Sequence, residues 1–213
     1  MILFLFINLA GVIMNDTLVF VDNGFFKLVK KEFEDKIGKK KKFLQTFRNI
    51  CKKEKLNLKH LFFYTAPPYQ SESPTEKEKS LMRNYRYLLA ILKHKRWITV
   101  REGRCQRLKI DGNYKYAQKG VDILISIDLM EVQNKFPDIK ELILIACDSD
   151  FVPLIRNIIS KDIKVILYTY FERKRDSPFS RYNELLQVCT KWVKLNESYF
   201  EDSERENNKK EER

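Results

Sequence analysis

Short apolar runs alternate with helix-like segments along most of this chain, and this alternation restricts its fold more than any other feature. Strands separated by helices need crossover connections, which leave the strands parallel and cover both faces of the sheet. No long hairpin signal interrupts the pattern. The sequence therefore predicts an α/β fold with a mainly parallel sheet. The expected strands are residues 17–21, 58–65, 97–101, 140–146, 163–168 and 191–195.

Helical periodicity fills most of the intervals between these strands. A helix is also expected where Ser73 precedes Pro74, with the serine as cap and the proline at the first helical position. Residues 102–116 are basic and contain glycine, which indicates an edge or a loop. The remaining expected helices are residues 25–37, 42–53, 119–134, a segment around Pro153, and 182–189.

Composition limits the domain count and the class of partner. The chain has 213 residues, 44% of them hydrophobic, and this suits one globular domain. Its formal net charge of +12 favours a polyanionic partner such as nucleic acid, but a lysine-rich surface can also serve only solubility. The four cysteines form no CxxC pair, which predicts neither a zinc site nor a disulfide framework and suggests a cytoplasmic protein.

The two ends of the chain differ in composition from the rest. Residues 1–13 are almost wholly apolar but too short to span a bilayer, and no membrane partner is expected. We hypothesise that they are an N-terminal extension and that translation begins at Met14. The folded domain is then expected over residues 14–196. Residues 197–213 are nearly all polar or charged, which predicts a disordered tail.

Acidic residues follow two of the expected strands. Asp148 and Asp150 come shortly after the apolar run 141–145, and Asp22 closes the run 17–21 before Asn23. The carboxyl ends of parallel strands open onto the crevice where ligands bind in such sheets. Either site alone is better explained as a turn or a helix cap, because Asp, Asn, Ser and Gly are favoured there.

A third acidic group lies on the helical segment 119–134. Asp128 falls on the apolar face of this helix, and Asp122 flanks that face near its start. A carboxylate buried there needs a cation, a donor or a metal, because its desolvation costs several kcal/mol. For Asp128, a buried pair with Lys or Arg and a functional role remain equally open. For Asp122 the alternative is a first-turn acid favoured by the helix dipole.

Collecting Asp22, Asp122, Asp148 and Asp150 in one crevice would create strong repulsion, which Mg²⁺ or Mn²⁺ would relieve. An acidic cluster that binds such an ion suits metal-assisted phosphodiester hydrolysis. Basic side chains outside the cluster would hold the nucleic-acid backbone.

These residues together resemble the NYN domain, in the LabA-like branch of the PIN-like nuclease superfamily. The resemblance runs from residue 19 to about 195 and implies a three-layer α/β/α PIN-like, Rossmannoid domain. It also implies a metal site formed by Asp22, Asp122, Asp148 and Asp150, with RNA as substrate. The matching strings are VFVDNGFF at 19–26, YTAPPYQ at 64–70, EGR at 102–104, QKGVDILISIDL at 118–129 and DSDFVP at 148–153.

The chain departs from the family pattern at two places. Ala146 and Cys147 stand where many relatives have Ser-Gly, so a close backbone approach at that corner is less favoured. Cys189 and Thr190 replace an Ala-Asp pair, which removes an outer carboxylate.

The resulting expectation is a Mg²⁺- or Mn²⁺-dependent ribonuclease with endonucleolytic action. The alternative is an RNA-binding or regulatory module that does not cleave. A phosphatase or nucleotide-binding protein is weaker, because no GxGxxG or GxxxxGK string is present. The sequence leaves oligomeric state open, a homodimer included. Arg101, Arg104, Lys115 and Lys119 are expected to contact phosphates, with Asn23 and Ser149 supporting the acidic site.

Overall fold

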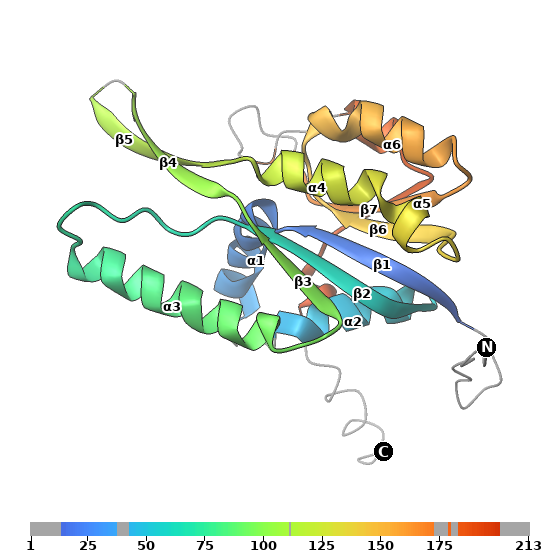
Figure 1. The fold of residues 1–213 in the computed structure, drawn as a ribbon, viewed down its shortest axis with the longest axis horizontal. Helices are drawn as coiled ribbons and strands as arrows, with labels where there is room; N and C mark the ends of the chain where they lie inside the picture. Colours follow the sequence, from blue (N-terminus) through green and yellow to red (C-terminus); the bar gives the residue numbers. More distant parts are fainter. Residues whose placement is uncertain (1–13, 38–42, 111, 173–178, 180–182, 201–213) are drawn as a thin grey trace, which may run out of the picture.

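A computed structural model describes residues 14–37, 43–110, 112–172, 179 and 183–200. In this part of the chain a six-stranded sheet forms the centre of the molecule, and its strands are parallel (Figure 1). The α/β prediction with a mainly parallel sheet is thus confirmed. The strands are β1 (Asn15–Asp22), β2 (Leu56–Thr65), β3 (Ile98–Glu102), β6 (Glu141–Ile145), β7 (Lys164–Thr169) and β8 (Lys191–Lys194).

The strand order predicts a ligand-binding crevice at the middle of the sheet. The order is β3-β2-β1-β6-β7-β8, so the chain winds outward from β1 in one direction and then outward from β6 in the other. In such doubly wound sheets, ligands bind outside the carboxyl ends of the strands where the winding reverses. Here that point lies between β1 and β6, the strands that Asp22 and the Asp148 turn follow.

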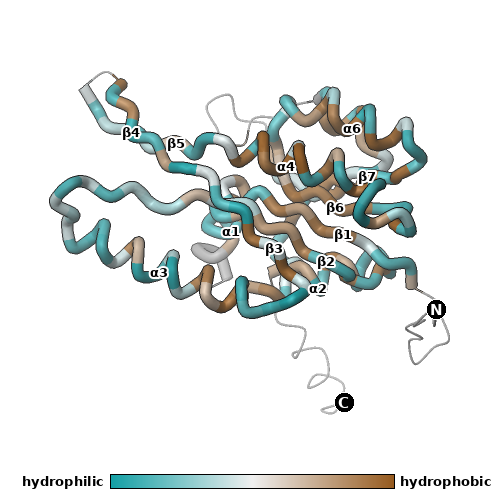
Figure 2. Tube along the Cα trace, viewed as in Figure 1, coloured by the Kyte–Doolittle hydropathy of each residue, from teal (hydrophilic) through white to brown (hydrophobic). Residues whose placement is uncertain are grey.

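Helices cover both faces of the sheet, as expected. On one face, α1, α2 and the end of α3 pack in one apolar cluster, and α4 to α7 pack in a second cluster on the other face. Figure 2 shows the apolar strands between more polar outer surfaces. The helices are α1 (Asn23–Ile37), α2 (Phe43–Lys53), α3 (Glu76–Lys93), α4 (Val121–Met130), α5 (Val132–Lys135), α6 (Val152–Ile159) and α7 (Asn183–Val188).

The start of α3 differs from the sequence-based expectation. The helix begins at Glu76, and its cap is Thr75, whose side chain accepts a hydrogen bond from the Glu78 amide. The Glu78 carboxylate accepts the Thr75 amide in return at 2.7 Å, completing a capping box. This reciprocal pair satisfies two otherwise unpaired donors, whereas the Ser73–Pro74 pair offers one cap only. Ser73 and Pro74 therefore precede the helix.

The segment after β3 is an antiparallel hairpin. The expectation that the chain contains no long hairpin, with an edge or a loop in this segment, was therefore wrong. β4 (Arg104–Ile110) pairs with β5 (Asn113–Lys119), and the turn contains Gly112 at φ +79°. This positive φ favours glycine, and the Asp-Gly pair at 111–112 of the sequence is the signal that predicts such a turn. The hairpin projects from the body of the molecule beside α3 (Figure 1).

The end of the domain extends further than expected. Residues 197–199 form a short 3₁₀ helix, η2 (Glu197–Tyr199), and Tyr199 and Phe200 are buried. The Phe200 ring lies 5.8 Å from Phe26 and 5.3 Å from Phe33 on α1, between ring centroids. The prediction of a disordered tail from residue 197 was thus wrong for its first four residues. Residues 201–213 and the proposed extension 1–13 lie outside the described part.

Among the helices that the structure describes, none is both long enough and apolar enough to cross a membrane.

Candidate acidic site

Asp22 ends β1 and caps the helix that follows. Its Oδ1 accepts hydrogen bonds from the amides of Gly24 at 2.8 Å and Phe25 at 3.3 Å. These bonds satisfy donors at the first turn of α1, so the cap interpretation of this residue holds. Capping uses one carboxylate oxygen and does not exclude a ligand at the other.

The Asp148 turn is a strand-to-helix junction. After β6, Asp148 caps the short 3₁₀ helix η1 (Ser149–Phe151), and its Oδ1 accepts the Asp150 amide at 2.9 Å. Helix α6 follows directly, with Pro153 in its first turn, where a missing amide hydrogen costs nothing. This placement confirms the predicted junction. Ser149 is half-buried in the same turn.

Asp122 reaches the same end of the sheet from a different element. It lies exposed in the first turn of α4, the helix that begins directly after Gly120, which has φ +79°. The helix dipole favours a carboxylate there, in agreement with the interpretation of Asp122 as a first-turn acid. The position also points the start of α4 toward the crevice. Both interpretations of Asp122 are therefore compatible with its placement.

The four carboxylates influence one another, although they are far apart in sequence. Burial raises the pKa of Asp22 to about 6, and the charges of Asp122 and Asp148 add to this rise against the two amide hydrogen bonds. Partial burial also raises the pKa of Asp122, and the charges of Asp148 and Asp150 raise this pKa as well. Repulsion of this kind indicates that the acids lie near one another at this end of the sheet.

Cys147 belongs to the same crevice, a role that the sequence reasoning missed. Burial, together with the charges of Asp22, Asp148 and Asp122, raises the pKa of its thiol to about 12. The thiol is therefore protonated at neutral pH and acts as a small, weakly polar wall of the site. Its position one residue before Asp148 is the sequence signal that could have indicated this.

Asn23 is fully buried behind Asp22. Its Nδ2 donates to the Thr65 hydroxyl at 2.9 Å, which ties the β1 turn to the end of β2. Its Oδ1 has no hydrogen-bond partner within the described residues. Leaving a buried acceptor unpaired costs about 1–3 kcal/mol. Such an atom is rare in a packed core, so Asn23 Oδ1 is a candidate for contact with a ligand.

Asp128 lies apart from the acidic cluster and forms a buried ion pair. Its carboxylate accepts two hydrogen bonds from Arg101, at 3.0 Å from Nε and 2.8 Å from Nη2. The Tyr64 hydroxyl donates a third at 3.0 Å, and Asp128 is only 4% exposed. Of the two interpretations left open for Asp128, the pair with an arginine is the one observed. Two of the Arg101 donors are thus engaged, and its contact with phosphate stays a prediction.

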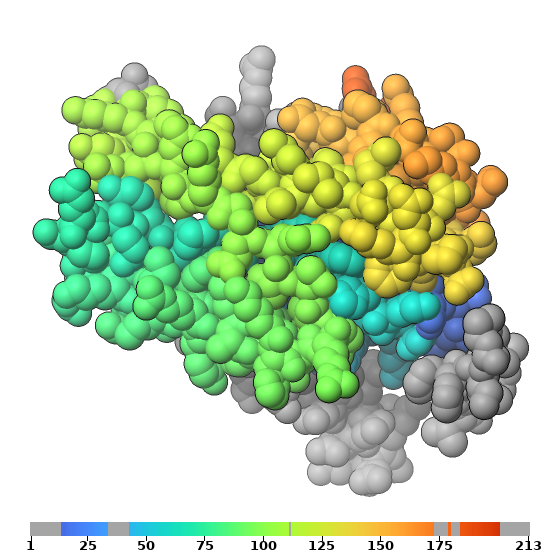
Figure 3. Space-filling view, in the orientation of Figure 1, coloured from blue at the N-terminus to red at the C-terminus, as the bar shows by residue number. Residues whose placement is uncertain are grey.

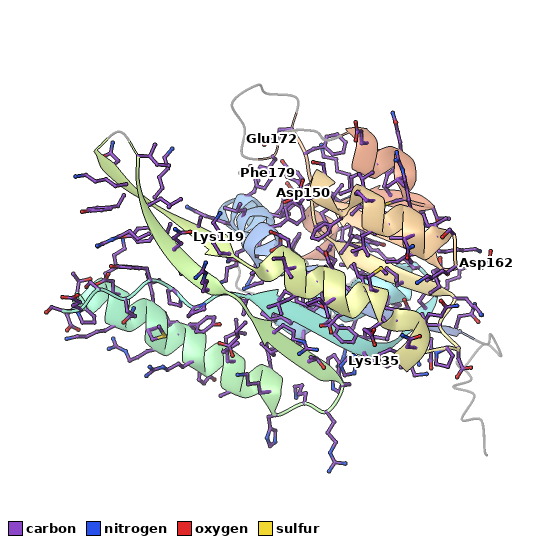
Figure 4. All side chains as sticks on the ribbon, turned by 45° about the horizontal axis from the view of Figure 1, so that its top comes forward. Lys119, Lys135, Asp150, Asp162, Glu172 and Phe179 are labelled. Carbon is purple, nitrogen blue, oxygen red and sulfur yellow. The ribbon has the colours of Figure 1, made fainter. Side chains whose placement is uncertain are left out.

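The other basic residues line the hairpin. Arg104 and Lys119 pair directly across its foot, and Lys115 lies further out, opposite Leu108. The charge of Lys119 partly offsets the raised pKa of Asp122, so this lysine is near the acids. Figure 4 shows Lys119 at the foot of the hairpin and Asp150 at the start of α6, whereas Lys135 lies at the far end of the α4–α5 segment. Phosphate contacts by these residues remain predictions.

The donor chemistry of the cluster suits a hard divalent cation. Carboxylate oxygens are the ligands that Mg²⁺ and Mn²⁺ prefer, and a cation would relieve the repulsion that raises the pKa of Asp22. As the side chains lie, no group of three His, Cys, Asp or Glu residues in the described ranges has an arrangement that would hold a metal ion. The acids therefore interact electrostatically and fit an ion by chemistry, without forming a closed ligand set in the described part of the chain.

Comparisons with known proteins assign the family. The model of the NYN domain matches residues 17–196, which covers the sheet, its helices and the hairpin. No curated protein matches the chain. A crystal structure of a protein of unknown function from Vibrio parahaemolyticus is similar in fold, with a TM-score of 0.51 and 16% identity over 88% of this chain and 96% of that one. NYN domains belong to the PIN-like nuclease superfamily. The chain is therefore a member of the NYN domain family.

Proposed function

We propose that this protein is a metal-dependent ribonuclease of the LabA-like branch that cleaves RNA internally. One observation carries the proposal: four carboxylates from three distant segments interact at the point where the winding of the sheet reverses. Clustered acids reduce stability when no cation is bound, and perturbed acids gathered at such a place are typical of functional sites. Family membership independently favours nuclease chemistry.

The acidic residues have distinct roles in this proposal. Asp22, Asp122, Asp148 and Asp150 would hold Mg²⁺ or Mn²⁺, which supplies charge at the phosphoryl oxygen and lowers the pKa of the attacking water. Asp122 is exposed and has a raised pKa, so it is suited to orient that water and accept its proton. Cys147 contributes bulk without charge.

The basic residues would position the substrate. Arg104 and Lys119 lie at the foot of the hairpin, and Lys115 lies further along it, so a phosphate backbone held there runs toward the acids. The net charge of the whole chain, +12, attracts a polyanion to the protein, and the local negative charge of the four acids favours the ion. Ser149 would donate a hydrogen bond to a ligand.

A second candidate function is an RNA-binding module without cleavage. One observation favours it: Oδ1 of Asp22 and Oδ1 of Asp148 are both used to cap helical turns. Acids retained only as caps would need no metal. The two functions differ in whether a divalent cation binds and in whether RNA is cut.

The decisive experiment compares the wild-type protein with Asp148→Asn and with Asp138→Asn. Asp138 is an exposed acid that precedes β6, at the opposite strand end from the cluster, so it is the matched control. Labelled RNA and single-stranded DNA are incubated with Mn²⁺, Mg²⁺ or chelator. We expect chelator-sensitive RNA cleavage that falls at least about a hundredfold in Asp148→Asn, with RNA affinity retained, and wild-type behaviour in Asp138→Asn.

A second measurement tests the ion without relying on activity. Mn²⁺ should raise the unfolding midpoint of the wild-type protein, since an ion that binds only the folded state stabilises it, and this rise should vanish in Asp148→Asn. Cleavage by Asp148→Asn at the wild-type rate would remove Asp148 from the catalytic site. Absence of both cleavage and a Mn²⁺ response in the wild type would favour the binding module.

A further inference from the structure

The hairpin has two chemically different faces. In an antiparallel pair, residues directly opposite each other lie on the same face, and successive residues alternate. The register therefore assigns two tyrosines and two cations to one face, and a mixture of aliphatic, amide and basic residues to the other. The opposed pairs on the aromatic face are Cys105 with Gln118, Arg107 with Tyr116, and Lys109 with Tyr114.

The aromatic face carries a continuous stack. The Arg107 guanidinium lies 4.5 Å from the ring centroid of Tyr114 and 4.7 Å from that of Tyr69, so it is held between two rings. The Tyr69 ring in turn lies 5.3 Å from Tyr116. Tyr69 belongs to the segment that leads from β2 to α3, and the two segments lie side by side in Figure 3. The stack thus joins the projecting hairpin to the body of the protein.

Packing alone does not account for this stack. Tyr114 is 54% exposed and Tyr116 is 57% exposed, so more than half of each side chain still faces water after the contacts are made. Rings that served only to hold the hairpin against the body of the protein would be expected to be buried, because burial of apolar area is what stabilises such a contact. Exposed rings beside Arg107 and Lys109 instead resemble a surface that accepts flat, anionic ligands.

The aromatic face leads directly to the acidic crevice. Tyr114, Tyr116 and Gln118 alternate along β5, which places them on one face at steps of about 7 Å. The Gln118 Oε1 lies 3.1 Å from the position of a Cβ added at Gly24, and Asp22 Oδ1 lies equally close to it. The row of side chains therefore ends at the turn that holds Asp22.

We propose that the hairpin is a base-stacking arm that binds unpaired nucleotides through Tyr114 and Tyr116 and guides the strand to the acidic crevice. Every base has a flat face, so stacking on tyrosine tolerates any sequence. A duplex stacks its bases about 3.4 Å apart and hides their faces, whereas rings about 7 Å apart suit bases that are separated. The inference rests on the proposed function for its ligand, RNA.

The test measures binding in the presence of chelator, so that cleavage does not interfere. The probes are a short fluorescent single-stranded RNA, the same backbone lacking its bases, and the corresponding duplex. Variants Tyr114→Leu and Tyr116→Leu keep apolar bulk without a ring, and Tyr114→Phe with Tyr116→Phe keeps both rings. Tyr87→Leu is the matched control, because Tyr87 is 71% exposed and belongs to α3 instead of the hairpin.

We expect the wild-type protein to bind single-stranded RNA more tightly than either other probe. Each leucine variant should weaken binding of that RNA about fivefold or more, with affinity for the base-free backbone unchanged. The phenylalanine variant and Tyr87→Leu should match the wild type. Unchanged RNA affinity in both leucine variants would overturn the inference, and so would an equal loss of affinity for the base-free backbone.

The inference and the proposed function fail separately. A wild-type protein that never cleaves RNA, but whose RNA binding depends on both rings, supports the arm and removes the nuclease proposal. A wild-type protein that cleaves through Asp148, but binds RNA equally well without the rings, overturns the arm and keeps the nuclease. Equal unfolding midpoints of the leucine variants and the wild type verify that the changes act on binding.

Discussion

Replacement of Asp22 by Asn should stabilise the metal-free protein at neutral pH. Burial and the charges of Asp122 and Asp148 oppose ionisation of this carboxyl, so an uncharged side chain removes a cost that the folded state carries. Asparagine keeps an oxygen that can accept the amides of Gly24 and Phe25, so the cap on α1 is retained. The gain therefore isolates the electrostatic cost of the acidic crevice.

The magnitude follows from the shift in pKa. The usual value of 3.8 rises to about 6 in the folded protein, which corresponds to about 3 kcal/mol as an upper limit. Below pH 3.8 the carboxyl is protonated in both folded and unfolded chains, and the substitution should have little effect. Between pH 3.8 and about 6 only the unfolded chain ionises, so wild-type stability falls as pH rises, and above about 6 the full cost is present.

Urea unfolding in chelator across this pH range measures the effect. The difference in unfolding free energy between Asp22→Asn and wild type should grow by up to about 3 kcal/mol between pH 3.5 and 7.5, because the titration of groups that do not interact with Asp22 cancels. Asp138→Asn controls for removal of one negative charge and should change stability by less than about 0.5 kcal/mol. A difference that is constant with pH, or that favours the wild type at pH 7.5, would refute the crevice as described.

Two further substitutions test contacts around the site. Asp128→Ala should lower the free energy of unfolding by about 3 kcal/mol, because it leaves Arg101 without its buried acceptor. Urea unfolding measures this loss, and a loss below about 1 kcal/mol would contradict the ion pair. Gly103→Ala should destabilise the protein by about 1–3 kcal/mol, since the added Cβ would lie 2.6 Å from the Lys119 carbonyl oxygen. Unchanged stability in the same assay would contradict the close approach at the foot of the hairpin.

Local chemistry along the chain determined much of what the structure shows. Apolar runs alternating with helical periodicity predicted the parallel sheet, because crossover helices force that orientation. Pro153 predicted the start of α6 after the Asp148 turn. Proline has no amide hydrogen, and the first turn of a helix does not need one for its hydrogen bonds. The apolar face around Asp128 predicted that this carboxylate needs a partner.

Local chemistry did not determine every element. Residues 102–116 were interpreted as an edge or a loop because they are basic and contain glycine. Charged residues suit an exposed hairpin equally well, and the Asp-Gly pair in the sequence at 111–112 favours a hairpin turn. The first residues of the charged tail were expected to be disordered, yet Tyr199 and Phe200 are buried against other elements. A composition average over the segment hides two aromatic residues whose burial outweighs their polar neighbours.

The sequence by itself determined which residues end strands and which carry charge, because periodicity and turn chemistry act over a few residues. Only the tertiary structure decided which of these residues meet. Asp22 and the Asp148 turn share a crevice because β1 lies beside β6, and Arg101 pairs with Asp128 because β3 places it next to Tyr64 on β2. Strand order and register are set by packing of the whole core, and no local pattern contains that information.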